Sequence, residues 1–84
     1  TEGPPELQAW PTEKRVQAHI DLGQSYLQRG KLEIARESFE KALQVDSSSS
    51  EAYHGLGLVE AQQLNMSKAS TYLKKAVQLD SSNI

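Results

Sequence analysis

The chain has 84 residues, a formal net charge of −2 and no cysteine. A chain of this length holds at most one small domain and buries only about 60% of the surface that its unfolded form exposes, so marginal stability is expected. The negative charge, with no basic stripe to offset it, argues against nucleic-acid binding. Without cysteine there are neither disulfides nor thiolate metal sites, and no apolar run approaches the ~20 residues of a membrane span.

The chain is expected to be all-α, beginning with an irregular segment. Residues 1–11 contain all three prolines and predict an irregular lead-in. A first helix is predicted over residues 13–29, with Thr12 as its N-cap and Gly30 as its stop. A second helix is predicted over 32–45, because its apolar residues recur at the spacing of one buried face. β-branched residues never alternate in period two, so no strand is expected.

A serine-rich segment separates the second predicted helix from the third. Residues 46–50, DSSSS, predict a loop, because clustered serines compete for backbone hydrogen bonds. Ser48 and Glu51 have the spacing of a capping box that starts the next helix. The remaining elements are two helices and a second polar loop, predicted over residues 50–63, 68–79 and 80–83.

The sequence repeats itself with a period of 34 residues. When residues 16–50 are aligned with residues 50–84, eleven positions are identical. A period of 34 residues that holds two helices is the signature of one repeat architecture. Gly23 and Gly57 are predicted to lie where the two helices of each pair cross, because a missing side chain lets the axes approach near the lower end of the usual ~8–10 Å. In the first copy the identical positions are Ala18, Leu22, Gly23, Gln28, Ala35, Lys41, Ala42, Gln44, Asp46, Ser47 and Ser48.

On these residues the chain resembles the tetratricopeptide repeat. The resemblance implies two antiparallel helical hairpins stacked as a short right-handed α-solenoid, and a fragment of a longer repeat protein. It divides the chain into a lead-in with the start of the first helix over 1–15, repeat 1 over 16–49 and repeat 2 over 50–83. Glu60 departs from the pattern, since the first copy has Tyr26 there. The matching positions, all expected in the core, are Leu22, Gly23, Tyr26, Ala35, Phe39 and Ala42, then Tyr53, Leu56, Gly57, Ala69, Leu73 and Ala76.

No catalytic or metal site is expected. His19 and His54 are 35 residues apart, one step out of register with the repeat, so they lie on different faces of their helices. A zinc site would need carboxylates to complete it. No serine has an adjacent base at helical spacing, and Gly55 and Gly57 lie inside a helix rather than in a phosphate-binding loop. The chain is therefore predicted to be no enzyme and to need no metal or cofactor.

Binding of a protein or peptide through a surface remains as the predicted function. Stacked hairpins form a concave face, which in tetratricopeptide repeats is lined mainly by the first helix of each pair. Its mixture of amides and apolar side chains suits an extended peptide or a partner helix; alternatively, two repeats make too short a groove. Ile20 and Gln24 stand where a chaperone-type carboxylate clamp would have lysine and asparagine, so no such clamp is expected. The predicted groove residues are Gln17, Ile20, Gln24, Leu27, Gln28, Glu51, His54, Leu58, Ala61 and Gln62.

A second resemblance concerns the cellular role. Residues 17–46 are similar to the first repeat of the type IV pilus pilotins, which are outer-membrane lipoproteins that assist assembly of the pilus secretin. That resemblance implies a periplasmic, outer-membrane-anchored protein, whereas a general scaffold would be cytoplasmic, and the sequence leaves both open. Ile84 would begin a third repeat in the 34-residue register. Apolar residues of the fourth helix then have nothing to cover them, which predicts self-association through this end or marginal stability.

Overall fold

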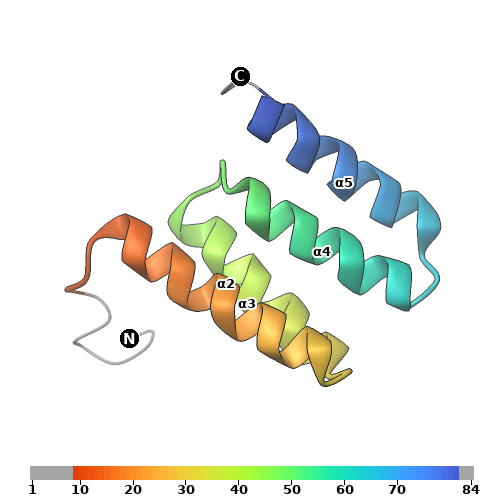
Figure 1. Ribbon diagram of the computed structural model, residues 1–84, viewed down its shortest axis with the longest axis horizontal. Helices are drawn as coiled ribbons and strands as arrows, with labels where there is room; N and C mark the ends of the chain where they lie inside the picture. The colour runs from red at the N-terminus through yellow and green to blue at the C-terminus, as the bar shows by residue number, and fades with distance from the viewer. Residues whose placement is uncertain (1–8, 82–84) are drawn as a thin grey trace.

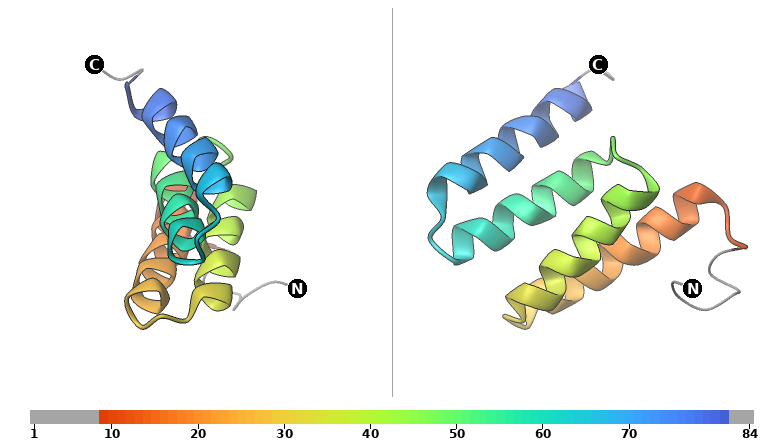
Figure 2. Two further views of the ribbon diagram at one scale, coloured as in Figure 1. Left: turned by 90° about the vertical axis from the view of Figure 1, so that its right-hand side faces the viewer. Right: turned by 180° about the vertical axis from the view of Figure 1, so that it is seen from behind.

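The computed structural model describes residues 9–81, and predictions that concern residues 1–8 and 82–84 lie outside this part of the chain. Figure 1 shows two helical hairpins side by side, and the left panel of Figure 2 shows α4 between α5 and the α2–α3 pair. The prediction of an all-α fold is confirmed for the described residues, which contain no strand. The helices are α2 (Thr12–Gln28), α3 (Leu32–Val45), α4 (Ser50–Gln62) and α5 (Met66–Ser81).

The starts of two helices, and the capping residue of a third, differ from the predicted ones. α2 already includes Thr12, and Pro11 is its N-cap residue. α4 is capped by Ser49 rather than Ser48, since the Ser49 Oγ accepts a hydrogen bond from the Ala52 N–H at 3.2 Å. Ser48 instead donates its N–H to the Asp46 side chain at 2.9 Å, which closes the turn before the helix. α5 begins at its first apolar residue, two residues earlier than predicted.

The end of α5 also differs from the prediction. Residues 80 and 81 prolong the helix instead of forming a loop. Their counterparts 46 and 47 leave the helix where the chain turns back to form α4. The same Asp-Ser pair therefore lies outside the helix in the first copy and inside it in the second.

The two hairpin turns share one backbone geometry but not one residue type. Gly30 has φ of +76°, and its N–H donates to the Leu27 carbonyl at 3.0 Å. Leu64, 34 residues later, has φ of +65°, and its N–H donates to the Ala61 carbonyl at 3.0 Å. Only glycine adopts this left-handed conformation freely, and other residues lose about 1–2 kcal/mol there. The second turn therefore carries backbone strain that the first does not.

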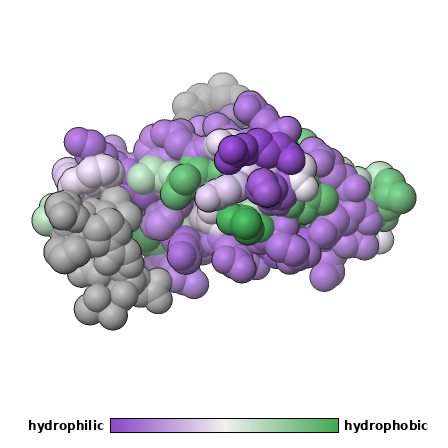
Figure 3. Space-filling model, turned by 90° about the horizontal axis from the view of Figure 1, so that it is seen from below, coloured by the Kyte–Doolittle hydropathy of each residue, from purple (hydrophilic) through white to green (hydrophobic). Residues whose placement is uncertain are grey.

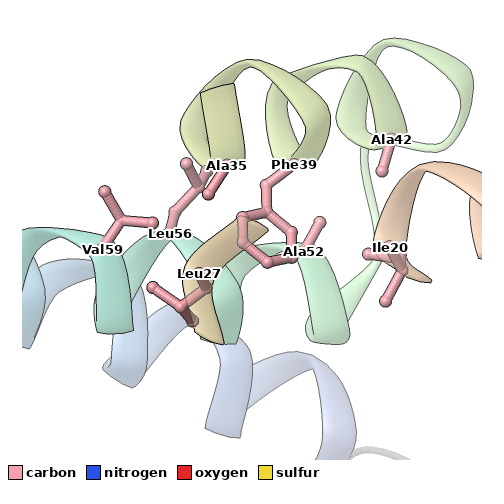
Figure 4. Close-up of a cluster of buried hydrophobic side chains, with 8 residues drawn as sticks. All are labelled: Ile20, Leu27, Ala35, Phe39, Ala42, Ala52, Leu56 and Val59. Carbon is pink, nitrogen blue, oxygen red and sulfur yellow. The ribbon is translucent and has the colours of Figure 1, made fainter. Parts of the chain in front are cut away.

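The hydrophobic core is centred on Phe39 of α3, which is completely buried. Its ring lies between Gly23 of α2 and Gly55 of α4, because a Cβ added at either glycine would come within 3.0 Å of three ring carbons. The space that Gly23 leaves is thus filled by the Phe39 ring, and Gly55 leaves a second such space on the other side of the ring. Figure 4 shows the core side chains, which are Ile20, Leu27, Ala35, Phe39, Ala42, Ala52, Leu56 and Val59.

Leu22 is the exception among the positions expected in the core, because it is 49% exposed. Its counterpart Leu56 is buried, since α4 turns that side toward the first hairpin. None of the helices α3, α4 and α5 covers the same side of α2. Tyr26, Tyr53 and Leu73 are half-buried. The remaining expected positions are buried, namely Gly23, Ala35, Phe39, Ala42, Leu56, Gly57, Ala69 and Ala76.

A buried ion pair joins the two hairpins. The Arg36 Nη1 of α3 lies 3.1 Å from the Glu60 Oε2 of α4, and the Glu60 side chain is only 3% exposed. The second oxygen of Glu60 accepts a hydrogen bond from the Asn65 Nδ2 at 2.9 Å. Arg36 also donates to the Gln63 Oε1, and Gln63 donates to the Glu33 Oε2 at 3.2 Å. The Arg36 Nε, by contrast, has no hydrogen-bond partner.

Candidate functional site

The structure places eight of the ten predicted groove residues at least partly at the surface. The two corrections are Ile20 and Leu27, which belong to the core cluster and cannot contact a ligand. They are covered because α4 packs against α2. Gln17, at the start of the predicted groove, is exposed and donates to the Asp21 carboxylate at 2.8 Å.

Three of the predicted groove residues meet in one pocket of about 360 Å³, here named the inner pocket. Gln24 comes from α2, and Glu51 and His54 come from the first turns of α4. The pocket also takes residues of α5 that the sequence analysis did not assign to the groove. Its lining residues are Gln24, Ser50, Glu51, His54, Leu73, Ala76, Val77 and Asp80.

A second pocket, here named the outer pocket, has a volume of about 650 Å³. It shares Leu73 and Val77 with the inner pocket, so the two form one continuous strip along α4 and α5. This strip is named the open face. Of the predicted groove residues, Ala61 lines the outer pocket. The outer pocket is lined by Ala61, Met66, Ala69, Ser70, Leu73, Lys74, Val77 and Gln78. Gln17, Gln28, Leu58 and Gln62 line neither pocket.

The open face is the counterpart of the surface on which α4 packs. In the 34-residue register Leu73 takes the place of Phe39, and Val77 takes the place of Leu43. Phe39 is buried and Leu43 is half-buried, whereas Val77 is 65% exposed. The signal in the sequence that identifies these residues of α5 is the 34-residue register. It aligns α5 with α3, and α4 packs on α3.

The opposite end of the molecule has a different character. Figure 3 shows the molecule from the side away from α5, where hydrophilic side chains dominate and hydrophobic ones are scattered. On α2, Asp21 and Ser25 are exposed, and they correspond to the buried Gly55 and Val59 of α4. The two ends of the molecule thus present a polar surface and an apolar one.

The described residues do not form a site for a metal ion or a membrane span. Within residues 9–81 no group of three or more histidine, aspartate or glutamate side chains is placed to hold a metal. None of the helices in that part of the chain is long and apolar enough to cross a membrane. The features available for binding are therefore on the surface. They are exposed amide side chains, two carboxylates at the inner pocket and the apolar residues of the open face.

Comparisons with known proteins assign the repeat. The family model for the tetratricopeptide repeat matches residues 20–84. The chain is 39% identical over 66 residues to the type IV pilus assembly protein PilF of Pseudomonas aeruginosa, and the alignment covers 79% of this chain and 26% of that protein. It is 34% identical over 58 residues to cellulose synthase operon protein C of Komagataeibacter sucrofermentans and of Komagataeibacter xylinus, covering 69% of this chain and 4% of each relative.

The chain therefore spans 26% or less of the length of these relatives. No solved structure matches it significantly. The family match extends over both hairpins and agrees with the all-α solenoid of tandem hairpins that the structure shows. The chain belongs to the tetratricopeptide repeat family, whose members are scaffolds for protein–protein interaction.

Proposed function

We propose that this chain is a non-catalytic scaffold that binds an extended peptide or a partner helix through the groove on α2 and α4. The observation that carries the proposal is the inner pocket, where Gln24, Glu51 and His54 from both helices meet above apolar side chains of α5. Amide side chains donate to and accept from a peptide backbone, and the apolar residues remove side chains of a partner from water.

The exposed groove residues provide a direct test by site-specific photo-crosslinking. A benzoylphenylalanine at Gln24, exposed on α2 and lining the inner pocket, should yield a discrete crosslinked protein in the cells of origin. The same probe at Glu37, exposed on α3 and outside both pockets, serves as the matched control. A crosslink pattern that is identical at the two positions, or absent at Gln24, would contradict binding through the groove.

A second candidate function is a pilotin-like role in type IV pilus biogenesis, assisting assembly of the secretin. It is supported by the 39% identity to a protein named as a type IV pilus assembly protein. The test is peptide mapping of the parent protein from cells. A lipid-modified cysteine upstream of Thr1 and recovery with the outer membrane support this role. An unlipidated parent protein found only in the cytoplasm would refute it.

Self-association through the C-terminal end stays a prediction of this chain's behaviour. It would use the open face, which is the apolar end of the molecule. Sedimentation velocity over a hundredfold range of concentration tests it, because a dimer would raise the sedimentation coefficient with concentration. A sedimentation coefficient that stays constant over this range would contradict it.

A further inference from the structure

We propose that the edge formed by the two hairpin turns docks on the surface of an anionic lipid membrane, with Leu64 inserted among the headgroups. The inference goes beyond the scaffold function, because it concerns neither the groove nor the open face and names a different kind of partner. Figure 1 shows both turns along the lower right edge of the molecule, and the right panel of Figure 2 shows the same edge from behind. This edge, here named the turn edge, is defined by the exposed residues Arg29, Gly30, Lys31, Ile34, Leu64 and Lys68.

Stacking of hairpins leaves the turn edge uncovered. Gly30 and Leu64 are equivalent in the 34-residue register. Gly30 is exposed although the second hairpin follows it, and Leu64 is 78% exposed although the first hairpin precedes it. A neighbouring hairpin on either side therefore leaves this position free. The turn edge is thus a different surface from those on which hairpins pack.

Leu64 is a residue that the fold itself does not require. Its φ is +65°, and the first copy has glycine at the same backbone geometry. The core cluster does not include Leu64, and neither pocket is lined by it. A bulky apolar side chain that is exposed on a strained backbone indicates a role outside the protein core.

The turn holds Leu64 on a fixed base. Gln63, which precedes it, accepts a hydrogen bond from Arg36 of the first hairpin. Asn65, which follows it, donates its N–H to the Glu60 carbonyl and its Nδ2 to the Glu60 carboxylate, both at 2.9 Å. The residues on both sides of Leu64 are therefore already ordered, so insertion of its side chain costs little conformational entropy.

Basic side chains accompany the apolar ones along the turn edge. Arg29 and Lys31 flank Gly30 in the first turn, and Lys68 lies at the start of α5, four residues after Leu64. All three basic side chains are exposed, and the ion pairs described within residues 9–81 involve none of them. They are therefore available to lipid phosphates, which attract lysine and arginine at a membrane surface.

The acidic side chains lie mainly elsewhere. On the turn edge, Glu33 is exposed, but its Oε1 lies 3.9 Å from the Arg36 Nε, which offsets its charge. The opposite edge holds the starts of α2 and α4 and the ends of α3 and α5. An anionic surface therefore repels the opposite edge and attracts the turn edge. The charged residues described at the opposite edge are Glu13, Asp46, Glu51 and Asp80, with Lys14 and Arg15.

The shape of the turn edge favours a membrane over a protein as its partner. A stable protein interface needs about 800 Å² of surface from each partner, whereas the turn edge offers the tips of two short turns. Its residues line neither of the two pockets, so it has no recess for a side chain of another protein. Lipid headgroups adapt to a protruding side chain and need no matching recess.

The expected affinity follows from these groups. Burial of one leucine side chain raises the affinity about tenfold to hundredfold. Each basic residue near an anionic surface raises it about fivefold. Ile34, which is 43% exposed, adds apolar contact beside the first turn. We therefore expect weak and reversible binding that requires about millimolar lipid.

The first test is binding of the chain to sucrose-loaded vesicles in a sedimentation assay. Vesicles of equal parts phosphatidylglycerol and phosphatidylcholine should bind the chain, severalfold less at 300 than at 50 mM salt, and phosphatidylcholine vesicles should bind little. Leu64→Gly should lower the affinity at least about tenfold without loss of stability, because glycine adopts this backbone freely. The matched control Leu22→Gln, which alters an exposed leucine midway along α2, should leave the affinity unchanged.

The basic residues are tested by two double variants of equal net charge. Lys31→Gln with Lys68→Gln should lower the affinity for anionic vesicles about 25-fold, since each lysine contributes about fivefold. Lys41→Gln with Lys75→Gln removes two exposed lysines beyond the middle of α3 and of α5 and should lower it much less.

Tryptophan fluorescence reports which edge enters the membrane. Trp10, the one tryptophan of the sequence, precedes α2 at the opposite edge. Brominated lipids in anionic vesicles should therefore leave its emission unquenched. Leu64→Trp in a chain that carries Trp10→Phe should show emission at shorter wavelength and strong quenching by the same lipids.

Three results overturn the inference. The first is equal binding of the Leu64→Gly variant and the unmodified chain to anionic vesicles, including no binding of either. The second is quenching of Trp10 as strong as in the Leu64→Trp variant. The third is a discrete protein crosslinked through benzoylphenylalanine at Leu64 in cells by a chain that binds no vesicles, which would assign the turn edge to a protein partner. Crosslinking through Gln24 reports on the groove separately, so a failure of this inference is distinguishable from a failure of the scaffold function.

Discussion

The enclosure of Phe39 by two glycines predicts that Gly55→Ala destabilises the protein although alanine favours helices. The added methyl group would lie within 3.0 Å of three carbons of the ring. The ring cannot retreat, because Gly23 and α2 lie on its other side. Overpacking of this kind costs about 1–3 kcal/mol, and the better helix propensity of alanine returns about 0.5–1 kcal/mol. We expect a net loss of about 1–2 kcal/mol in the free energy of unfolding, a balance that follows from the same magnitudes.

Gly57→Ala, two residues away in the same helix, is the matched control. Its added methyl group meets the side chain of Leu73 at 2.6 Å, but Leu73 is only half-buried and lies on the open face. The leucine can therefore move aside, and the overpacking is relieved. Because the gain in helix propensity is the same at both positions, the difference between the two variants measures the confinement of Phe39.

Urea denaturation followed by circular dichroism measures both variants. With a slope near 1 kcal/mol/M for so small a protein, Gly55→Ala should lower the midpoint by about 1–2 M, while Gly57→Ala shifts it little. Adding Phe39→Leu to Gly55→Ala should restore part of the loss, which a double-mutant cycle would show as a coupling of about 0.5–3 kcal/mol. Equal midpoints for the two alanine variants, or a Gly55→Ala protein as stable as the parent, would refute this reasoning.

Three further substitutions test local features. Leu64→Gly should stabilise the protein by about 1 kcal/mol, because Leu64 is 78% exposed and held at positive φ; an unchanged unfolding temperature would contradict the strain. Glu60→Ala should cost about 3 kcal/mol in urea denaturation, since it leaves Arg36 without its buried partner. If the ion pair causes the loss, combining Glu60→Leu with Arg36→Met should restore most of it. Ser49→Ala should cost about 1 kcal/mol and speed hydrogen exchange of the Ala52 amide, whose cap it removes; unchanged exchange would argue against the cap.

The sequence was sufficient to predict the number of helices and their pairing, because the apolar spacing and the 34-residue period agree. It was not sufficient to predict burial at equivalent positions. Leu22 and Leu56 match in register, yet only Leu56 is covered by a neighbouring hairpin. Ile20 and His54 also match, and here only the first lies beneath a neighbouring helix. Burial in a repeat protein depends on the neighbour that a position faces, which differs between the first and the last repeat.

The candidate site was predicted in part for the same reason. Gln24, Glu51 and His54 line one pocket, but the inner pocket takes half of its lining from α5. The family rule assigns the groove mainly to the first helix of each pair, whereas α5 is the second helix of its pair. Glu60 was noticed as a departure from the repeat, but its ion pair with Arg36 required knowledge of which helices touch.

The contacts of α5 within residues 9–81 have a consequence for the dynamics of this part of the chain. Among the described helices, α4 packs on the other three, whereas α5 packs mainly on α4. Undocking α5 therefore breaks one interface and leaves the Phe39 core of the first hairpin and α4 intact. Such an opening requires less free energy than global unfolding, so amide protons of α5 should exchange ahead of those of α3. The native ensemble would then contain a minor three-helix species in which the apolar underside of α5 is free to bind elsewhere, including in the same position on another molecule.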